Sequence, residues 1–182
     1  MARVKVKVWA SEPGTVAQNN KSEVSMDYKI RELRQSEIHI LDVFLYEAIY
    51  VPEGTPAPPK DIIKQPELQV YVADFGKQKG DICYVAEMES KIVGAVWVRI
   101  MDDYGHVDDD TPSFAISLLK EYRNYGIGTG LMKRMLSELK EQGYKQTSLS
   151  VQKLNYAAGM YKKVGFEIID ENNEEYLMMC KL

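Results

Sequence analysis

Two spacings of apolar residues alternate along the chain and predict helices and strands in turn. Apolar residues at helical spacing, such as Ile38, Leu41 and Leu45, predict an amphipathic helix that Ser36 would cap. Short runs rich in β-branched residues predict strands. The expected strands cover residues 28–33, 82–88, 92–101, 113–119, 147–151, 167–170 and 176–181, and the expected helices begin near Ser36, Pro66, Gly128 and Asn155.

The order of these elements is β-α-α-β-β-β-α-β-α-β-β, which is typical of an α/β fold with a mixed sheet. We expect parallel pairing where a helix intervenes between two strands. At the hairpins, one of which turns at Glu89-Ser90-Lys91, we expect antiparallel pairing.

The beginning of the chain has a different pattern. Valines alternate with basic residues there and predict a short amphipathic strand, formed by Val4, Val6 and Val8. Pro13-Gly14 and a polar stretch follow, which is the composition of a linker. We therefore expect a loosely attached extension over residues 1–25 and one compact domain over residues 26–182.

Composition narrows the class of protein. A chain of 182 residues with 45% hydrophobic and 27% charged residues fits one globular domain. A net charge of −4 argues against general binding of nucleic acid. The sequence has neither an apolar run of about 18 residues nor the apolar segment of a secretory signal, so we expect a cytoplasmic protein that makes no membrane contact.

Metal chemistry has little support in the sequence. Cys83 and Cys180 lie in apolar runs, and two cysteines are too few for a four-cysteine zinc site. His39 and His106 have no second histidine or cysteine at the spacing of metal ligands. We therefore predict no metal site.

A glycine-rich loop carries the strongest chemical signal. The strand 113–119 leads into Arg123-Asn124-Tyr125-Gly126-Ile127-Gly128, where a helix begins. Backbone N–H groups and the helix dipole at such a loop suit phosphate oxygens, and Gly126 and Gly128 permit positive φ angles. Lys120, Arg123 and Lys133 supply nearby cations. The alternative is a tight turn that needs glycine for geometry alone, and the loop by itself does not decide between the two.

Two common phosphate motifs do not fit this loop. A P-loop needs Gly-Lys-Ser/Thr at the helix start, whereas Leu131 follows Gly130 here. A dinucleotide fingerprint needs a third glycine at position 131 and a carboxylate at the end of the next strand, and neither is present.

Two segments together resemble the GNAT N-acetyltransferase superfamily. The loop residues 123–130 look like the Arg/Gln-x-x-Gly-x-Gly/Ala acetyl-CoA motif. Asn155, followed by Tyr161-Lys162-Lys163-Val164-Gly165-Phe166, resembles the superfamily's Asn-Pro-Ala…Tyr-x-x-x-Gly-Phe segment, with Tyr156 at the usual proline position. The resemblance covers roughly residues 28–182.

The resemblance implies a GNAT-like mixed sheet of about seven strands, with helices on both faces and a gap between the fourth and fifth strands that holds acetyl-CoA. Leu118 N–H would then bind the thioester carbonyl, and the amides of residues 125–130 would bind the pyrophosphate. Asn155 would contact the cofactor or fix the last helix. The implied cofactor-binding residues are Leu118, Arg123, Tyr125, Gly126, Ile127, Gly128, Thr129, Gly130 and Asn155.

Tyr161 is the candidate catalytic acid. A phenol with a reference pKa of about 10 can protonate the departing CoA thiolate. The alternative is an aromatic side chain that packs with Met160 and Val164 on a buried helix face, and the motif favours the catalytic role.

The acceptor is less well defined by the sequence. We expect an amine-bearing acceptor, with a cationic small molecule, a protein N-terminus and a lysine as the candidates, bound by a monomer or homodimer. Glu47, Tyr50, Asp108 and Asp110 are the candidate acceptor residues. The alternative for the aspartates is a solvated acidic loop.

Three functions remain from these observations. The first is transfer of an acetyl group from acetyl-CoA to a primary amine by direct attack in a ternary complex. The second is a non-catalytic module that binds acetyl-CoA, because no general base is evident. The third is a ping-pong mechanism through Cys83 or Cys180, which is disfavoured because neither has a histidine or lysine neighbour in its strand.

Overall fold

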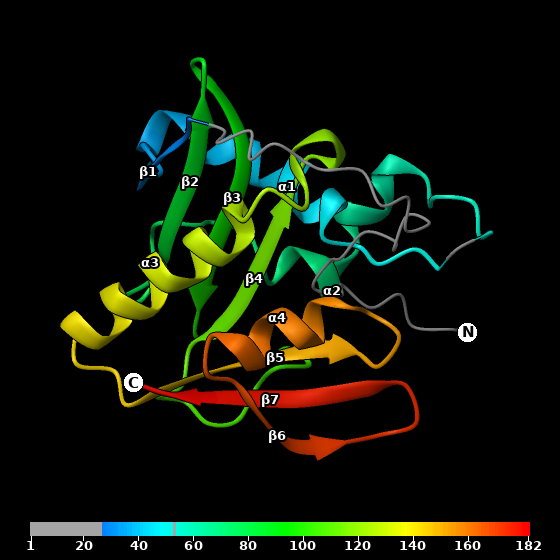
Figure 1. The fold of residues 1–182 in the computed structure, drawn as a ribbon, viewed down its shortest axis with the longest axis vertical. Helices are drawn as coiled ribbons and strands as arrows, with labels where there is room; N and C mark the ends of the chain where they lie inside the picture. Colours follow the sequence, from blue (N-terminus) through cyan, green and yellow to red (C-terminus); the bar gives the residue numbers. More distant parts are fainter. Residues whose placement is uncertain (1–26, 53) are drawn as a thin grey trace, which may run out of the picture.

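The computed structural model describes residues 27–52 and 54–182, so the expected extension over residues 1–25 and its strand lie outside the described residues. The described residues form a seven-stranded sheet in the order β1-β2-β3-β4-β5-β7-β6 (Figure 1). Its strands are β1 Lys29–Glu32, β2 Ile82–Met88, β3 Lys91–Arg99, β4 Ser113–Leu118, β5 Gln146–Gln152, β6 Glu167–Glu171 and β7 Glu175–Lys181.

The sheet opens between its fourth and fifth strands. All neighbouring strands pair antiparallel except β4 and β5, which are parallel and share a single residue pair, Ser113 with Ser148. The Ser148 N–H donates to the carbonyl of Pro112 at 3.1 Å at the same end. From there β4 and β5 diverge (Figure 1). The predicted mixed sheet and its gap are confirmed.

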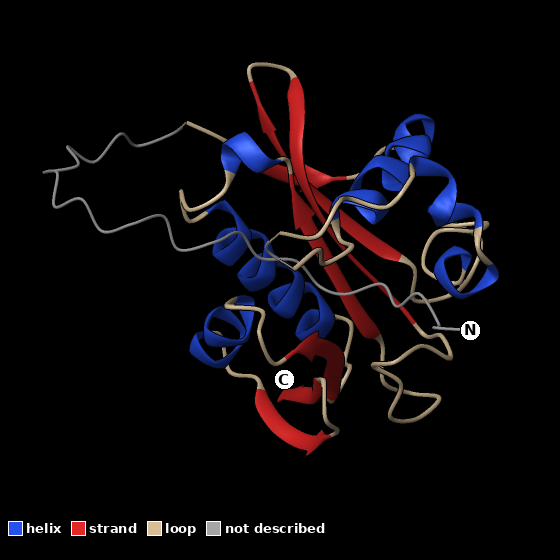
Figure 2. Ribbon diagram, turned by 90° about the vertical axis from the view of Figure 1, so that its right-hand side faces the viewer, coloured by secondary structure: helices blue, strands red, loops and turns tan. Residues whose placement is uncertain are grey.

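Helices cover both faces of the sheet, as Figure 2 shows. On one face lie α3 (Ile127–Glu141) and α4 (Ala157–Lys163), and their apolar side chains pack with those of β2 to β5 and β7. On the other face lie the helical segments η1 (Gln35–Ile40), α1 (Leu41–Glu47), η2 (Lys60–Lys64) and α2 (Pro66–Gln69). Each face therefore has its own hydrophobic core.

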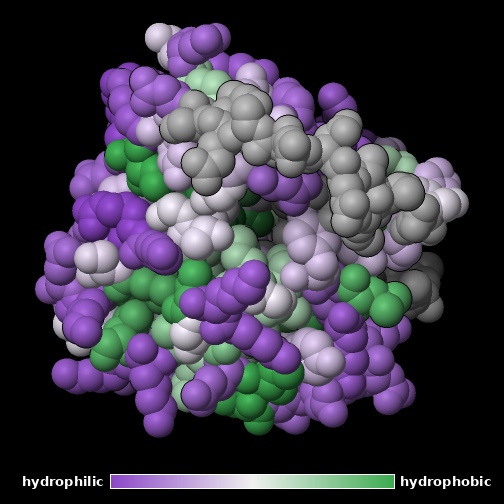
Figure 3. All heavy atoms as spheres, viewed as in Figure 1, coloured by the Kyte–Doolittle hydropathy of each residue, from purple (hydrophilic) through white to green (hydrophobic). Residues whose placement is uncertain are grey.

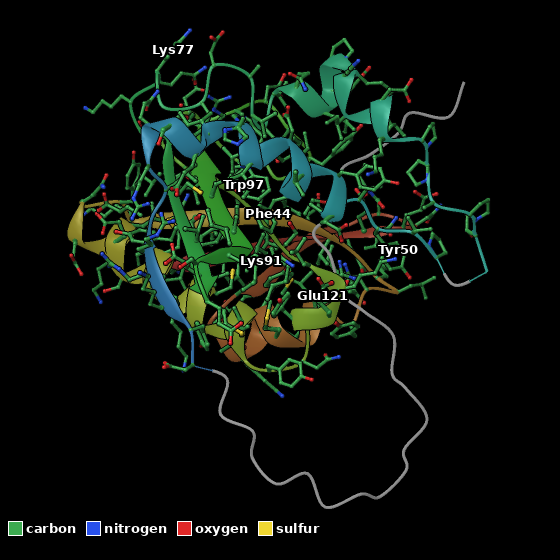
Figure 4. All side chains as sticks on the ribbon, turned by 90° about the horizontal axis from the view of Figure 1, so that it is seen from above. Phe44, Tyr50, Lys77, Lys91, Trp97 and Glu121 are labelled. Atoms are coloured by element: carbon green, nitrogen blue, oxygen red, sulfur yellow. The ribbon has the colours of Figure 1, made fainter. Side chains whose placement is uncertain are left out.

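The core under α1 is built around two aromatic residues. Phe44 of α1 and Trp97 of β3 are fully buried and lie together beneath the helix (Figure 4). The Trp97 indole N–H donates to the carbonyl of Tyr71 at 3.2 Å, so its polar atom is satisfied. Burial of each ring stabilises the fold by about 2–3 kcal/mol. This core fixes α1 against the C-terminal half of β4, where the Ser117 hydroxyl donates to the carbonyl of Phe44 at 2.6 Å.

The first two helices begin or end differently from the prediction. Ser36 does not cap the first helix; a 3-10 segment begins at Gln35, and the Glu37 carboxylate accepts from the N–H of Arg34 at 2.9 Å. The second helix begins at Pro66 as predicted but ends after one turn at Gln69. Its apolar residues Leu68, Val72 and Phe75 are buried nonetheless, because the turns that follow hold them against the sheet.

The Glu37 carboxylate also forms a two-pronged ion pair. It accepts from two nitrogens of the Arg31 guanidinium, each at 2.8 Å. This hydrogen-bonded pair lowers the pKa of Glu37 to about 2. The pKa of Glu37 is lower in the folded state than in the unfolded state. The ion pair therefore stabilises the fold fully at pH values above the unfolded pKa of about 4.3, and this stabilisation is lost as the pH falls toward the folded pKa.

We therefore expect Glu37→Gln to lower the free energy of unfolding by about 1 kcal/mol at pH 7, and by less than half as much at pH 3. Urea denaturation at both pH values measures this difference. Glu121→Gln is the control, because Glu121 forms an exposed ion pair with Lys91 (3.4 Å; Figure 4) that solvent screens. An equal effect of Glu37→Gln at both pH values would contradict the assignment.

Candidate active site

A cavity of about 330 Å³ opens where β4 ends, between the start of α3 and α4. Figure 3 shows a hollow in this face near the C-terminal end of β4. Side chains from both faces of β4 line the cavity, so it reaches the strand edge that faces the gap. The lining residues are Ile116, Ser117, Leu118, Arg123, Asn124, Gly126, Gly128, Thr129, Tyr156, Ala157, Gly159, Met160 and Lys163.

The edge of β4 supplies hydrogen-bond donors to this cavity. The N–H of Leu119 donates to the carbonyl of Val93 on β3 at 3.0 Å. Because backbone N–H groups alternate in direction along a strand, those of Leu118 and Ile116 point away from β3 and into the gap. The structure therefore places the predicted Leu118 N–H where a ligand in the gap would meet it.

The beginning of α3 supplies a second set of donors. Gly126 precedes the helix with φ = +79°, and the N–H of Gly130 makes the first bond of the helix, to the carbonyl of Gly126 at 3.0 Å. The N–H groups of Ile127, Gly128 and Thr129 thus have no acceptor within the helix, and its first turn contains no acidic residue. The expected positive φ is confirmed at Gly126 and is wrong at Gly128, which lies within the helix.

Arg123, which lines the cavity and is buried, forms an ion pair with the half-buried Glu47. Arg123 Nε donates to the carbonyl of Leu118 at 2.9 Å, and its Nη2 donates to Glu47 Oε2 at 2.8 Å. Burial lowers the pKa of Arg123 to about 10, against the opposing charge of Glu47. From the sequence, Arg123 was expected to bind the cofactor and Glu47 the acceptor, whereas the structure joins the two in a contact that holds the end of β4 against α1.

The contribution of this ion pair to the stability of the fold can be tested by substitution. We expect Arg123→Met to lower the free energy of unfolding by about 2–4 kcal/mol, because it leaves the Glu47 carboxylate and the Leu118 carbonyl without this donor. The double variant Arg123→Met/Glu47→Leu should recover part of the loss, because no half-buried carboxylate then remains. Denaturant titration of the wild type, both single variants and the double variant checks this, and a loss equal to the sum of the single losses would argue against the coupling.

Tyr161 is fully buried on α4. Its ring packs against Phe166 with centroids 6.0 Å apart, and its hydroxyl has no hydrogen-bond partner among the described residues. Burial raises the pKa of Tyr161 well above 10, so the phenol stays protonated at neutral pH. The side chain lies beneath the cavity wall formed by its neighbours in α4, Ala157 and Met160, and does not itself line the cavity.

Four other predicted cofactor residues take different positions. The Asn155 amide oxygen accepts from the N–H of Ala157 at 3.0 Å, so this buried residue fixes the start of α4. Ile127 is buried in the core, and Tyr125 is 43% exposed. Gly130 faces β1 and not the cavity, because a Cβ there would lie 2.7 Å from the Tyr28 hydroxyl.

The predicted acceptor residues are not all brought together. Asp108 and Asp110 are exposed in the loop before β4, and Asp108 accepts from the Gln146 amide at 3.2 Å, at the start of β5. That position is one strand length, about 17 Å, from the cavity end of β4. Tyr50 is half-buried just beyond α1 and is not among the lining residues (Figure 4).

The structure adds one cavity residue, Lys163, and one interacting aspartate, Asp103, that the sequence does not single out. Lys163, at the end of α4, is the described lysine that lines the cavity, whereas Lys120 and Lys133 do not. Asp103 is half-buried at the other end of β4; Ser113 Oγ and Tyr71 Oη donate to it at 2.8 and 2.9 Å, and burial raises its pKa against these hydrogen bonds. No local signal separates Asp103 from the other aspartates of this loop, because its hydrogen bond to Tyr71 joins segments that are distant in sequence.

Thiol and metal chemistry gain no support from the described residues. Cys83 and Cys180 are both buried, and burial raises the pKa of each thiol, which disfavours the thiolate. Within residues 27–52 and 54–182, no three histidine, cysteine or acidic side chains gather as a metal site. Over the same ranges, no helix combines the length and apolar character needed to cross a membrane.

Solved structures define the class of fold. A PaiA N-acetyltransferase from Thermoplasma acidophilum, in complex with coenzyme A, superposes with a TM-score of 0.64 at 19% identity and covers 86% of this chain and 100% of that one. At this identity the likeness shows the fold of an acetyltransferase. In sequence, residues 79–168 match the family model for the acetyltransferase (GNAT) domain. The chain carries a GNAT acetyltransferase domain, as its motifs predicted.

Curated relatives agree with this family. N-acetyltransferase 8B from Homo sapiens is 28% identical over 108 residues, which are 59% of this chain and 48% of that protein. An N-alpha-acetyltransferase from Sulfolobus acidocaldarius is 29% identical over 122 residues, which are 58% of this chain and 72% of that protein. The chain thus spans about half the length of the human relative.

Proposed function

We propose that this chain transfers an acetyl group from acetyl-CoA to a primary amine by direct attack in a ternary complex. The observation that carries the proposal is the cavity at the open β4–β5 edge, with backbone donors of β4 on one side and of the α3 N-terminus on the other. Donors at these two places suit the two parts of acetyl-CoA that need them, its thioester with the pantetheine amides and its pyrophosphate.

The residues present fit this ligand. The N–H groups of Gly128 and Thr129, at the positive end of the helix dipole, would hold the phosphates, and the Lys163 ammonium would add a positive charge. The Leu118 N–H would donate to the thioester carbonyl and stabilise the negative charge that develops on its oxygen. Arg123 would keep Leu118 in place through the carbonyl of that residue.

Tyr161 would supply the proton for the departing thiolate. Its hydroxyl is protonated, buried and without a partner among the described residues, so a sulfur atom that reached it would meet an available donor. Because the hydroxyl lies beneath the cavity wall, the side chains of α4 would have to adjust when the ligand enters the gap.

The acceptor class is a primary amine, and peptide α-amines come first among its members. This order rests on the archaeal relative, which is named an N-alpha-acetyltransferase. The panel that tests it contains a peptide with a free N-terminal alanine, Nα-acetyllysine, spermidine and kanamycin, with release of free CoA thiol as the measurement. Binding of acetyl-CoA without release above hydrolysis for any of them would favour the non-catalytic module.

The glycine before α3 gives a matched test of cofactor binding. Gly126 (φ +79°) and Gly143 (φ +87°) stand at opposite ends of α3, and a Cβ added at either position would meet open space. Replacement of either by alanine should destabilise the fold by a similar amount, about 1–2 kcal/mol, through the strained φ. We expect Gly126→Ala alone to weaken acetyl-CoA binding, by about tenfold, in isothermal titration calorimetry. Equal acetyl-CoA affinities of the two variants would contradict the proposal that the loop binds acetyl-CoA.

Tyr161 gives the test of chemistry. We expect Tyr161→Phe to lower kcat by about 100-fold, within the range for loss of a general acid, and to leave the dissociation constant of acetyl-CoA within about threefold of wild type. Steady-state thiol release with the best acceptor of the panel, together with calorimetry, separates the two quantities. Unchanged turnover would remove Tyr161 from the acid role.

A further inference from the structure

Polar side chains gather on the sheet face opposite α3 and α4, at the end of β5. Leu149 and Val151 pack in the core under α3 and α4, so the alternating residues Ser150 and Gln152 face the other side of the sheet. The Gln152 Oε1 atom is buried and has no hydrogen-bond partner among the described residues. A buried carbonyl oxygen without a donor is costly, and it marks a place where a ligand can supply one.

Glu175 of β7 lies beside Gln152. It stands directly opposite Gln152 in the β5–β7 register, so the two side chains lie on the same face. Glu175 is 4% exposed, and its Oε2 atom accepts from the Ser150 hydroxyl at 3.3 Å. Its N–H donates to the Asn172 side chain at 2.8 Å, which fixes the strand where it begins.

The loop before β4 packs on the same face of the sheet, beside the pair. Gly105 lies so close to β5 that a Cβ there would be 3.2 Å from Leu149 Cα and from the Ser150 nitrogen. Its carbonyl accepts from the Ser148 hydroxyl at 2.6 Å. Gln152 follows two residues after Ser150 at the end of β5, and Glu175 lies opposite it at the start of β7.

The strand order places the pair on the β5 side of the gap. Ser117 and Gln152 each lie four residues beyond the Ser113–Ser148 pair, so their side chains are on the same face of the sheet and on opposite sides of the opening. Leu118, whose N–H points into the gap, is the next residue. An amine bound by Gln152 and Glu175 would therefore approach a thioester in the gap from the face opposite α3, α4 and Tyr161.

We propose that Gln152 and Glu175 form the subsite for the acceptor amine, a primary alkylammonium, with Gln152 Oε1 as acceptor for its N–H and Glu175 as its proton acceptor. This inference rests on the proposed acetyl transfer and assigns to it the base that the sequence does not reveal.

The protons and electrons of the step balance. An ammonium N–H bond breaks and its proton passes to the Glu175 carboxylate, which frees the nitrogen lone pair. That pair forms the C–N bond to the thioester carbon, and the C–S bond breaks with its electrons on sulfur. The sulfur takes the proton of Tyr161, the phenol is restored by the second proton of the nitrogen, and Glu175 releases its proton to solvent.

The test of Glu175 compares three variants with the best acceptor of the amine panel. Glu175→Gln keeps the shape of the side chain and should lower kcat/KM by at least 100-fold. Glu175→Asp keeps the carboxylate and should retain more activity than the Gln variant, whereas a purely structural role would give the reverse order. Glu174→Gln changes the adjacent, exposed carboxylate and should match the wild type. Acetyl-CoA affinity should be unchanged in all three.

Gln152→Leu gives the second readout. It removes a buried oxygen without a partner among the described residues, so the melting temperature should stay equal or rise, whereas KM for the amine should rise at least tenfold. A lowered melting temperature with unchanged KM would contradict the subsite.

The outcomes distinguish this inference from the function on which it rests. A wild type that binds no acetyl-CoA, or that releases no thiol with any of the four amines, would overturn the proposed function. An active wild type with Glu175→Gln as active as Glu174→Gln would overturn the amine subsite alone.

Discussion

The single parallel residue pair between β4 and β5 is the constraint on which the rest of the structure depends. Strands that pair at Ser113 and Ser148 and then separate leave backbone donors and acceptors along both edges. Buried groups of this kind need partners. Arg123 satisfies the carbonyl of Leu118 and anchors it to Glu47, and Asn155 fixes the start of the helix beyond the gap. The gap is thus a built feature of the fold, and the N–H groups that point into it are available to a ligand.

The proposed cofactor and acceptor residues lie on opposite faces of the sheet. The glycine loop, Lys163 and Tyr161 belong to the face of α3 and α4, where the cofactor would enter. Gln152 and Glu175 face the other side of the sheet, which also carries the core that holds α1 against β4. An acyl group in the gap would lie between a proton donor on one face and a proton acceptor on the other. Because the sheet separates them, the two groups have different surroundings: the Tyr161 phenol is buried, and the Glu175 carboxylate accepts a hydrogen bond from Ser150.

Local residue chemistry explains which parts of the molecule the sequence predicts. Gly126 marks the start of α3 because its φ of +79° favours glycine, and Asn155 marks the start of α4 through its own side chain. Contacts between segments that are distant in sequence cannot be predicted in this way. Arg123 looks like a free phosphate ligand in the sequence, and only the fold brings Glu47 to it. Asp108 and Asp110 precede β4 along the chain, yet they lie at the strand end far from the cavity. Glu175 reaches Gln152 through the β5–β7 register, which no local pattern encodes.

The most direct test of this account is backbone amide NMR of the full chain with and without coenzyme A. Addition of the ligand should shift the amide signals of Leu118, Gly128 and Thr129 and slow their hydrogen exchange, while Leu68, in α2 within the core on the opposite face of the sheet, stays unchanged. Unchanged signals at Leu118 with the ligand bound elsewhere would contradict the claim that the β4–β5 gap is the binding site.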